Sequence, residues 1–175
     1  MRARVRSVTV LVVVLSLSCG GGGGPRKRSP PPVVESASVT IDPDGLGNPI
    51  SVSFASVTHS YNAAGDCSVI TMSSSTPAGW IVEIVWPGDS NPGMTDTSVF
   101  GVALVVTDPS SESYFASDFT LATTFIMVDK FAIGDEFTIA IGRETSGTFV
   151  GTSEWFTDPF FYLDLTGGTF TAARY

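Results

Sequence analysis

The sequence alternates between apolar and polar positions in many short runs, and this alternation constrains the fold most strongly. Within residues 80–86, Trp80, Val82, Ile84 and Trp86 fall on one side of an extended chain. Successive side chains of a β-strand point to opposite faces, so the run predicts a strand whose tryptophan-bearing face is buried. No stretch longer than about ten residues has the 3.6-residue period of an amphipathic helix. The alternation therefore predicts an all-β protein.

Further runs rich in β-branched and aromatic residues are also predicted as strands. Turn sequences containing Gly, Pro, Asn or Asp separate them. Roughly eight to ten short strands are typical of a single antiparallel β-sandwich, and a lipocalin-like up-and-down barrel is the alternative. The further runs are residues 38–41, 50–57, 67–72, 99–107, 119–128, 137–141, 148–153, 160–165 and 169–173.

Residues 1–18 have the organisation of a secretory signal peptide. Arg2, Arg4 and Arg6 form a basic start, and residues 8–17 are mostly apolar. This apolar run is about half of the roughly 20 residues that a membrane-spanning helix needs. The N-terminus is therefore expected to be an export signal that is cleaved.

The end of this signal, Leu-Ser-Leu-Ser-Cys at residues 15–19, resembles the lipobox of bacterial lipoproteins. The resemblance implies that Cys19 is acylated, with palmitate among its acyl chains, and becomes the N-terminus after cleavage. Gly20 follows the cysteine where an Asp would favour the inner membrane, so the same resemblance implies the outer membrane. An ordinary cleaved signal without acylation is the alternative. A lipid-anchored protein of the cell envelope is expected.

A linker is predicted at residues 19–32, between the anchor and the folded domain. Five glycines at positions 20–24 favour a flexible coil, and three prolines at positions 30–32 favour an extended segment. The basic residues at positions 26–28 lie close enough to the anchor to contact lipid headgroups, or serve as a soluble spacer.

The folded domain, predicted at residues 33–175, is strongly acidic. It contains all seventeen acidic residues but only Lys130, Arg143 and Arg174 as basic ones, which gives a formal net charge of −14. Such a charge repels nucleic acid and attracts cations or basic partners, although it also simply keeps a secreted domain soluble. A nucleic-acid partner is not expected.

The C-terminal segment carries a second, shorter resemblance. Residues 147–151, Gly-Thr-Phe-Val-Gly, and residues 167–172, Gly-Gly-Thr-Phe-Thr-Ala, resemble the closing strands of bacterial lipoproteins of unknown function. The resemblance implies a β-sandwich domain and supplies no activity.

Few residues are suited to catalysis. His59 is the only histidine, and no G-x-S-x-G motif accompanies it. Cys67 opens an apolar strand and is expected to be buried and unreactive. Glu83, in the middle of a strand, is the candidate acid for the alternative function of a secreted hydrolase, but spacing pairs no second acid with it. The chain is therefore predicted to be non-enzymatic.

Asp42, Asp44 and Asn48 form a candidate calcium loop. Their oxygens recur at alternate positions, with glycines at positions 45 and 47 that permit a tight loop, and the segment resembles the start of D-x-D-G calcium loops. A simple Asp-Gly turn is the other interpretation, and no other cofactor is expected.

Five aromatic residues, Trp155, Phe156, Phe160, Phe161 and Tyr162, surround an Asp-Pro turn. Not all of them can easily be buried there, so they are the candidate contact surface for a protein or glycan. Packing at the end of the fold is the alternative. The expected function is a binding or structural role at the envelope, with calcium-dependent adhesion or carbohydrate binding as alternatives.

Overall fold

The structure is a computed structural model that describes residues 32–43, 47–132, 143–155 and 158–174. These residues form strands, turns and loops without a helix, so the predicted all-β class is confirmed. In this part of the chain no helix is long and apolar enough to cross a bilayer. The strands are β1 (Ser36–Pro43), β2 (Ile50–Asn62), β3 (Cys67–Thr76), β4 (Ala78–Pro87), β5 (Met94–Asp96), β6 (Ala103–Thr107), β7 (Ser113–Ser117), β8 (Thr124–Lys130), β9 (Arg143–Trp155) and β10 (Asp158–Arg174).

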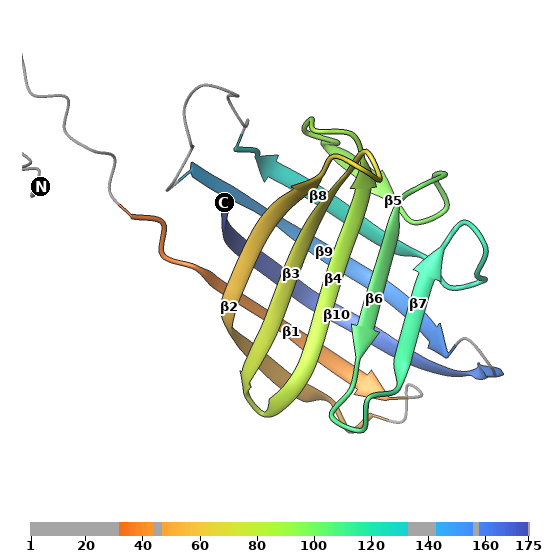
Figure 1. The fold of residues 1–175 in the computed structure, drawn as a ribbon. Coiled ribbons are helices and arrows are strands. Elements are labelled where there is room, and N and C mark those ends of the chain that lie inside the picture. Colours follow the sequence, from red (N-terminus) through yellow and green to blue (C-terminus); the bar gives the residue numbers. More distant parts are fainter. Residues whose placement is uncertain (1–31, 44–46, 133–142, 156–157, 175) are drawn as a thin grey trace, which may run out of the picture.

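Eight of these strands close into an antiparallel barrel (Figure 1). Around the barrel they follow the order β1, β2, β3, β4, β6, β7, β9 and β10, and β10 pairs with β1 again. Each strand of this circuit pairs with the circuit strands that precede and follow it in sequence. The predicted β-sandwich is therefore wrong, and the alternative, an up-and-down barrel, describes the architecture.

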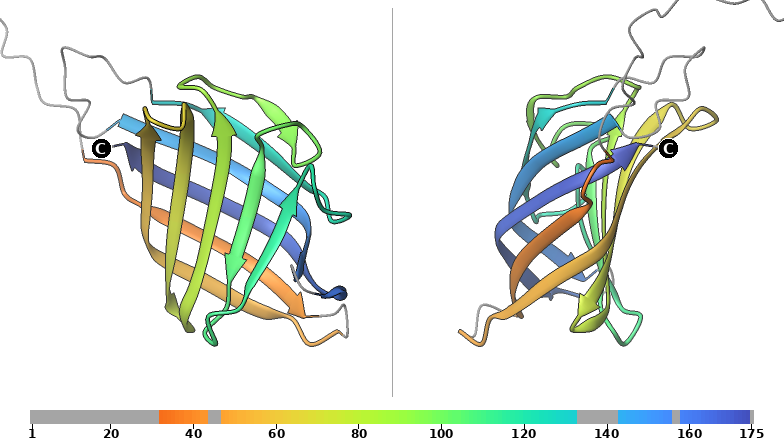
Figure 2. Two further views of the ribbon diagram at one scale, coloured as in Figure 1. Left: turned by 45° about the vertical axis from the view of Figure 1, so that its right-hand side comes forward. Right: turned by 90° about the vertical axis from the view of Figure 1, so that its left-hand side faces the viewer.

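The barrel closes because β9 and β10 are long and strongly bent (Figure 2). The register of β10 shifts between Leu165 and Gly168, and such bulges bend and coil a strand. A Cβ at Gly168 would lie 2.6 Å from the carbonyl oxygen of Phe149, so the two backbones approach more closely there than another residue allows. Alternation in sequence defines the two faces of a strand but not this curvature, and the sandwich prediction failed for that reason.

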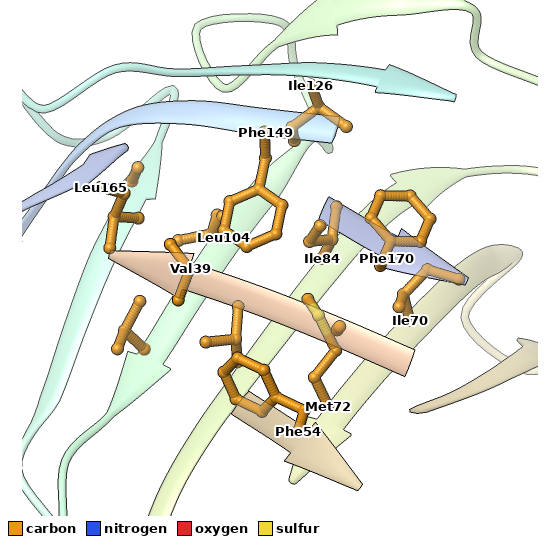
Figure 3. Packing of buried hydrophobic residues seen from close by; sticks show 14 of the residues in the cluster. Val39, Phe54, Ile70, Met72, Ile84, Leu104, Ile126, Phe149, Leu165 and Phe170 are labelled. Carbon is orange, nitrogen blue, oxygen red and sulfur yellow. The ribbon is translucent and has the colours of Figure 1, made fainter. Parts of the chain in front are cut away.

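The inward side chains fill the barrel (Figure 3). Trp80, Val82, Ile84 and Trp86 of β4 are all buried, which confirms the predicted core face of that strand. The labelled side chains in Figure 3 come from strands on all sides of the barrel and point toward one another, with Phe149 near their centre. The interior is thus a packed apolar core.

The barrel is joined by few residue pairs between β7 and β9. Only Tyr114 with Trp155 and Phe115 with Glu154 are paired there, whereas β1 pairs with β10 at seven positions. β8 pairs with the rest of this edge of β9, and β5 pairs with β8 (Figure 1). We call β5, β8, the loop at residues 118–123 and the facing part of β9 the seam.

Several predicted strand limits differ from the observed ones. The predicted strands at 99–107 and 119–128 begin too early, because their first residues form turns and a loop before β6 and β8. The predictions at 160–165 and 169–173 fall on one continuous strand, β10. β5 and β7 were not predicted, and residues 137–141 lie outside the described residues.

Candidate functional site

A pocket of about 400 Å³ opens where β7 leaves β9. It is lined by Phe115, Ser117, Phe119, Thr120 and Glu154. Phe115 and Glu154 are directly paired across the two strands, so their side chains share the outer face of the sheet. The pocket therefore has aromatic walls and one carboxylate, and it lies on the outside of the barrel.

The loop that forms one wall of this pocket is held in place by hydrogen bonds. The Glu154 carboxylate accepts hydrogen bonds from the backbone N–H groups of Leu121, at 3.1 Å, and Ala122, at 3.2 Å. The Thr120 hydroxyl accepts a bond from the N–H of Ser117 at 2.7 Å and lies 2.9 Å from the Ser117 carbonyl oxygen, to which it donates. These contacts fix the backbone of the loop, and with it the position of the loop side chains.

This ordered loop presents two large apolar side chains to solvent. Phe119 is 87% exposed and Leu121 is 89% exposed. Apolar side chains on the outer faces of β5, β8 and β9 share one face, because the paired residues of adjacent strands point to the same side. The loop lies next to this face, since it is bound to Glu154 of β9. We call the six side chains the seam patch: Phe119, Leu121, Met94, Phe125, Met127 and Val150.

The predicted aromatic surface is divided between the two faces of the sheet. Trp155 pairs with Tyr114, which packs against the core, so Trp155 lies on the inner side at the end of the barrel. The ring of Phe161 meets that of Trp155 edge-on, with their centroids 5.9 Å apart. These two aromatic residues pack on each other at the end of the barrel, where Phe161 is still 48% exposed.

Tyr162 is the member of the aromatic group that faces outward beside the pocket. It is paired with Glu154 across β9 and β10 and is partly exposed. Phe156 and the side chain of Phe160 lie outside the described part of the structure. Of the predicted aromatic residues described, only Tyr162 lies on the same outer face as the pocket.

The candidate calcium loop is organised by hydrogen bonds from its own backbone. The carboxylate of Asp42 accepts bonds from the N–H groups of Gly47, at 3.0 Å, and Asn48, at 3.2 Å. Asp44 lies outside the described residues. Among the residues that are described, no three His, Cys, Asp or Glu side chains gather as metal ligands would. Among the described residues the Asp42 carboxylate is thus an acceptor for backbone N–H groups.

The two candidate reactive groups, Glu83 and Cys67, lie on the outer face of the barrel. Glu83 is half-buried between Thr71 and Val105 of the adjacent strands, and its carboxylate accepts a hydrogen bond from the Thr71 hydroxyl at 3.3 Å. Cys67 is a free thiol and is half-buried, so the prediction that it is buried was wrong. Cys67 is not buried because it points to the same side of β3 as Val69 and Thr71, which are outward positions.

An ion pair between the buried Arg174 and the partly buried Asp89 lies at the end of the barrel at which β10 finishes. The guanidinium of Arg174 meets both carboxylate oxygens of Asp89, with Nη1–Oδ1 and Nη2–Oδ2 distances of 2.6 Å. Its Nη1 also donates to the carbonyl oxygen of Ala132 at 2.5 Å, and the ring of Phe131 lies beneath it at 5.6 Å. Asp89 and Arg174 are 85 residues apart, so local sequence patterns give no signal for this pair.

His59 lies beside this ion pair and is completely buried. Its Nδ1 is 2.9 Å from the Thr145 hydroxyl, and its Nε2 has no partner among the described residues. Burial lowers the pKa of His59 to about 4, and the positive charge of Arg174 acts in the same direction, whereas Asp89 opposes it. His59 is therefore a neutral core histidine at neutral pH.

A second pocket, of about 280 Å³, lies outside this ion pair. Its lining consists of Asp89, Ser90, Asn91 and Phe131. Asp89 and Phe131 already contact Arg174, so the groups at the base of this pocket belong to the surroundings of the ion pair.

Comparisons with protein families, with curated proteins and with solved structures find no match. The geometry by itself defines the class: a small up-and-down β-barrel with a packed interior, a partly buried ion pair at one end, and an apolar patch on its outer face.

Proposed function

We propose that this protein is a lipid-anchored component of the bacterial cell envelope that binds another macromolecule through the outside of its barrel and catalyses no reaction. The observation that carries the proposal is the exposure of Phe119 and Leu121 on a loop whose backbone is fixed by Glu154. An ordered loop that holds two large apolar side chains in solvent is explained by a partner that covers them.

The packed interior supports binding on the outside. Eight-stranded barrels that carry a small ligand hold it in an internal cavity. Here inward side chains such as Met72, Trp86 and Phe149 occupy that space. The outer pocket beside Glu154 and the seam patch are the surfaces that we assign to a partner.

The anchor rests on the sequence. Residues 15–19 resemble a lipobox, and acylation of Cys19 would hold the barrel at a membrane surface. Gly20, which follows the cysteine, favours the outer membrane by the same resemblance. The segment between Cys19 and β1 would give the barrel freedom to reach a partner.

Labelling of living cells with radioactive palmitate tests the anchor. We expect label and membrane fractionation for the wild-type chain, and loss of both for Cys19→Ser. A Cys19→Ser chain that still carries label and stays in the membrane fraction would contradict acylation at this residue.

Photo-crosslinking in cells tests the binding. A photoreactive amino acid at Phe119 should give a discrete crosslinked product, and the same group at Ser53, an exposed position on β2, should not. Equal crosslinking at both positions would show that the seam patch is not a specific binding surface.

A further inference from the structure

The seam patch combines apolar side chains with acidic ones. Asp96 is paired with Phe125 across β5 and β8, so its side chain shares the outer face with the patch. Asp129 lies at the register shift of β8 shortly beyond Met127, and it is exposed. Asp118 immediately precedes Phe119 in the loop. Carboxylates therefore lie beside the apolar side chains on β5, at the end of β8 and next to Phe119 in the loop.

The described basic side chains do not neutralise these carboxylates. Lys130 pairs with Glu144, with Nζ 2.9 Å from Oε2, and Arg174 is buried against Asp89 at the end of the barrel. The region from residue 33 onward has a formal net charge of −14. Carboxylates that border an apolar patch in so negative a field attract cations and repel anions.

This charge selects among the possible occupants of the patch. A second copy of the chain would bring the same carboxylates face to face, and an anionic lipid surface would be repelled in the same way. A protein segment with both apolar and cationic side chains would bury the patch and pair with its border.

Resting on the binding role proposed above, we infer that the seam patch docks a cationic, amphipathic segment of a partner protein. Phe119 and Leu121 insert among the apolar side chains of that segment, and Asp96, Asp118 and Asp129 face its lysines or arginines. The pocket beside Phe115 and Glu154 receives one side chain of the segment.

The test uses the full chain carrying Cys19→Ser, which has no acyl group, and three fluorescein-labelled synthetic peptides of equal length. One peptide alternates Lys and Leu, the second Glu and Leu, and the third Lys and Ser. Fluorescence anisotropy should show that the Lys–Leu peptide binds about tenfold or more tightly than either of the others, because only it offers both features. Equal binding of the Glu–Leu peptide, or of the Lys–Ser peptide, would overturn the inference.

Variants locate the binding. The double variant Phe119→Ser/Leu121→Ser should weaken binding of the Lys–Leu peptide by about tenfold or more, because it removes two apolar side chains that become buried in the complex. The matched double variant Val34→Ser/Ile81→Ser removes exposed apolar side chains outside the seam and should leave binding unchanged. If both double variants bind as the wild type does, or both lose binding equally, the seam patch is not the docking site.

Charge variants test the acidic border. Asp118→Asn/Asp129→Asn should weaken binding by a few fold and reduce its dependence on salt, because each exposed ion pair contributes little. Asp96 is left intact, since its carboxylate accepts hydrogen bonds from Ser98. An unchanged affinity together with an unchanged salt dependence would contradict the role of the carboxylates.

Two further measurements on the same variants test whether a lipid surface or a second copy of the chain occupies the patch instead. Sedimentation with phosphatidylcholine vesicles that disappears in Phe119→Ser/Leu121→Ser would assign the patch to a lipid surface, and a dimer that disappears in that variant would assign it to a second copy. Either result overturns the inference. Loss of the discrete crosslink at Phe119 would contradict the binding role itself. A crosslink at Phe119 together with no preference for the Lys–Leu peptide would overturn only the inference about the partner, so the two proposals fail separately.

Discussion

Two outer surfaces of this barrel are built from opposite kinds of side chain. On β1 and β10 the outward positions include Ser36, Ser38, Thr169 and Thr171, and the hydroxyl oxygens of Ser38 and Thr169 lie 3.2 Å apart. At the seam the outward positions carry the large apolar side chains of the seam patch instead. A sheet needs apolar side chains only on the face that meets the core, so the hydroxyl surface is what folding alone requires. The apolar surface at the seam therefore reflects a second requirement, which we assign to binding.

The same two regions differ in how their strands are joined. β1 pairs with β10 at seven positions and with β2 at five, whereas β7 pairs with β9 at two. At the seam, β8 and side-chain hydrogen bonds such as those of Glu154 replace the missing strand pairs. The seam is thus a region where a few side chains determine both closure and surface, and substitutions there should separate these two roles.

The largest effect is expected for Gly147→Val, which would break the closure of the seam. A Cβ at Gly147 would overlap the carbonyl oxygen of Met127 on β8 and lie 2.8 Å from the ring of Phe170. We expect the free energy of unfolding to fall by about 3 kcal/mol or more, because strands packed this closely cannot separate without loss of core contacts. Urea denaturation followed by tryptophan fluorescence measures this loss.

The control for Gly147→Val is Thr148→Val, at the next residue of β9, whose side chain is exposed. Its stability should stay within about 0.5 kcal/mol of the wild type. Equal urea midpoints for the two variants would show that β8 and β9 tolerate a wider spacing than the structure has.

The pH dependence of stability tests the other side of the barrel, where His59 of β2 is buried. Its pKa in the folded protein is about 4 and its unfolded value is 6.5, so the unfolded state binds more protons between these values. Stability should therefore fall as the pH falls from 6.5 through 4, by at most about 3 kcal/mol from this group. Denaturation midpoints measured across this range should show the decrease for the wild type.

His59→Gln provides the comparison, because glutamine does not titrate. Acidic residues contribute to the pH dependence of both proteins, and the difference between the two curves isolates the histidine. Parallel curves for wild type and variant from pH 6.5 to 4 would contradict a neutral, buried His59.

A smaller effect is expected when the loop of the seam is released. Glu154→Ala removes the acceptor for the N–H groups of Leu121 and Ala122. The free energy of unfolding should fall by about 1–2 kcal/mol, and hydrogen exchange at these two amides should accelerate. Asp129→Ala, at an exposed site on β8, should leave both unchanged, and protection that persists in Glu154→Ala would mean that other contacts hold the loop.

The smallest effect on stability is expected where the proposed effect on binding is largest. Phe119→Ser/Leu121→Ser removes side chains that are almost fully exposed. The free energy of unfolding should therefore change by less than about 0.5 kcal/mol, and the melting temperature should shift only slightly. Thermal unfolding followed by circular dichroism measures it. A large destabilisation would show that these side chains serve the fold, and the contrast between the two outer surfaces would lose its functional meaning.

The inner face of β4 could be predicted from the sequence because alternation is a local property. Trp80, Val82, Ile84 and Trp86 are buried as their spacing predicts. The same alternation predicted a strand from residue 119, and this start was wrong because Phe119 and Leu121 belong to a loop. A pattern that assumes apolar side chains are buried cannot detect those that a protein keeps exposed.

The candidate site was found in the sequence only in part. The aromatic group at residues 155–162 contributes Tyr162 beside the pocket, whereas Phe115 and Phe119 come from other segments. The role of Glu154 could not be predicted from the sequence, because it depends on backbone N–H groups more than thirty residues away. The sequence gives only the net negative charge of the domain, not the positions of its carboxylates around the seam patch.

By itself the sequence determined that this chain is a β-protein, which side of β4 faces inward, and that the domain is acidic, because each of these depends on neighbouring residues or on composition. Tertiary structure alone decided that the sheet closes, that Arg174 meets Asp89, and that Phe119 stays in solvent. Those outcomes depend on the register and curvature of strands far apart in the chain, and closure turns on backbone contacts that leave no periodic trace in the sequence.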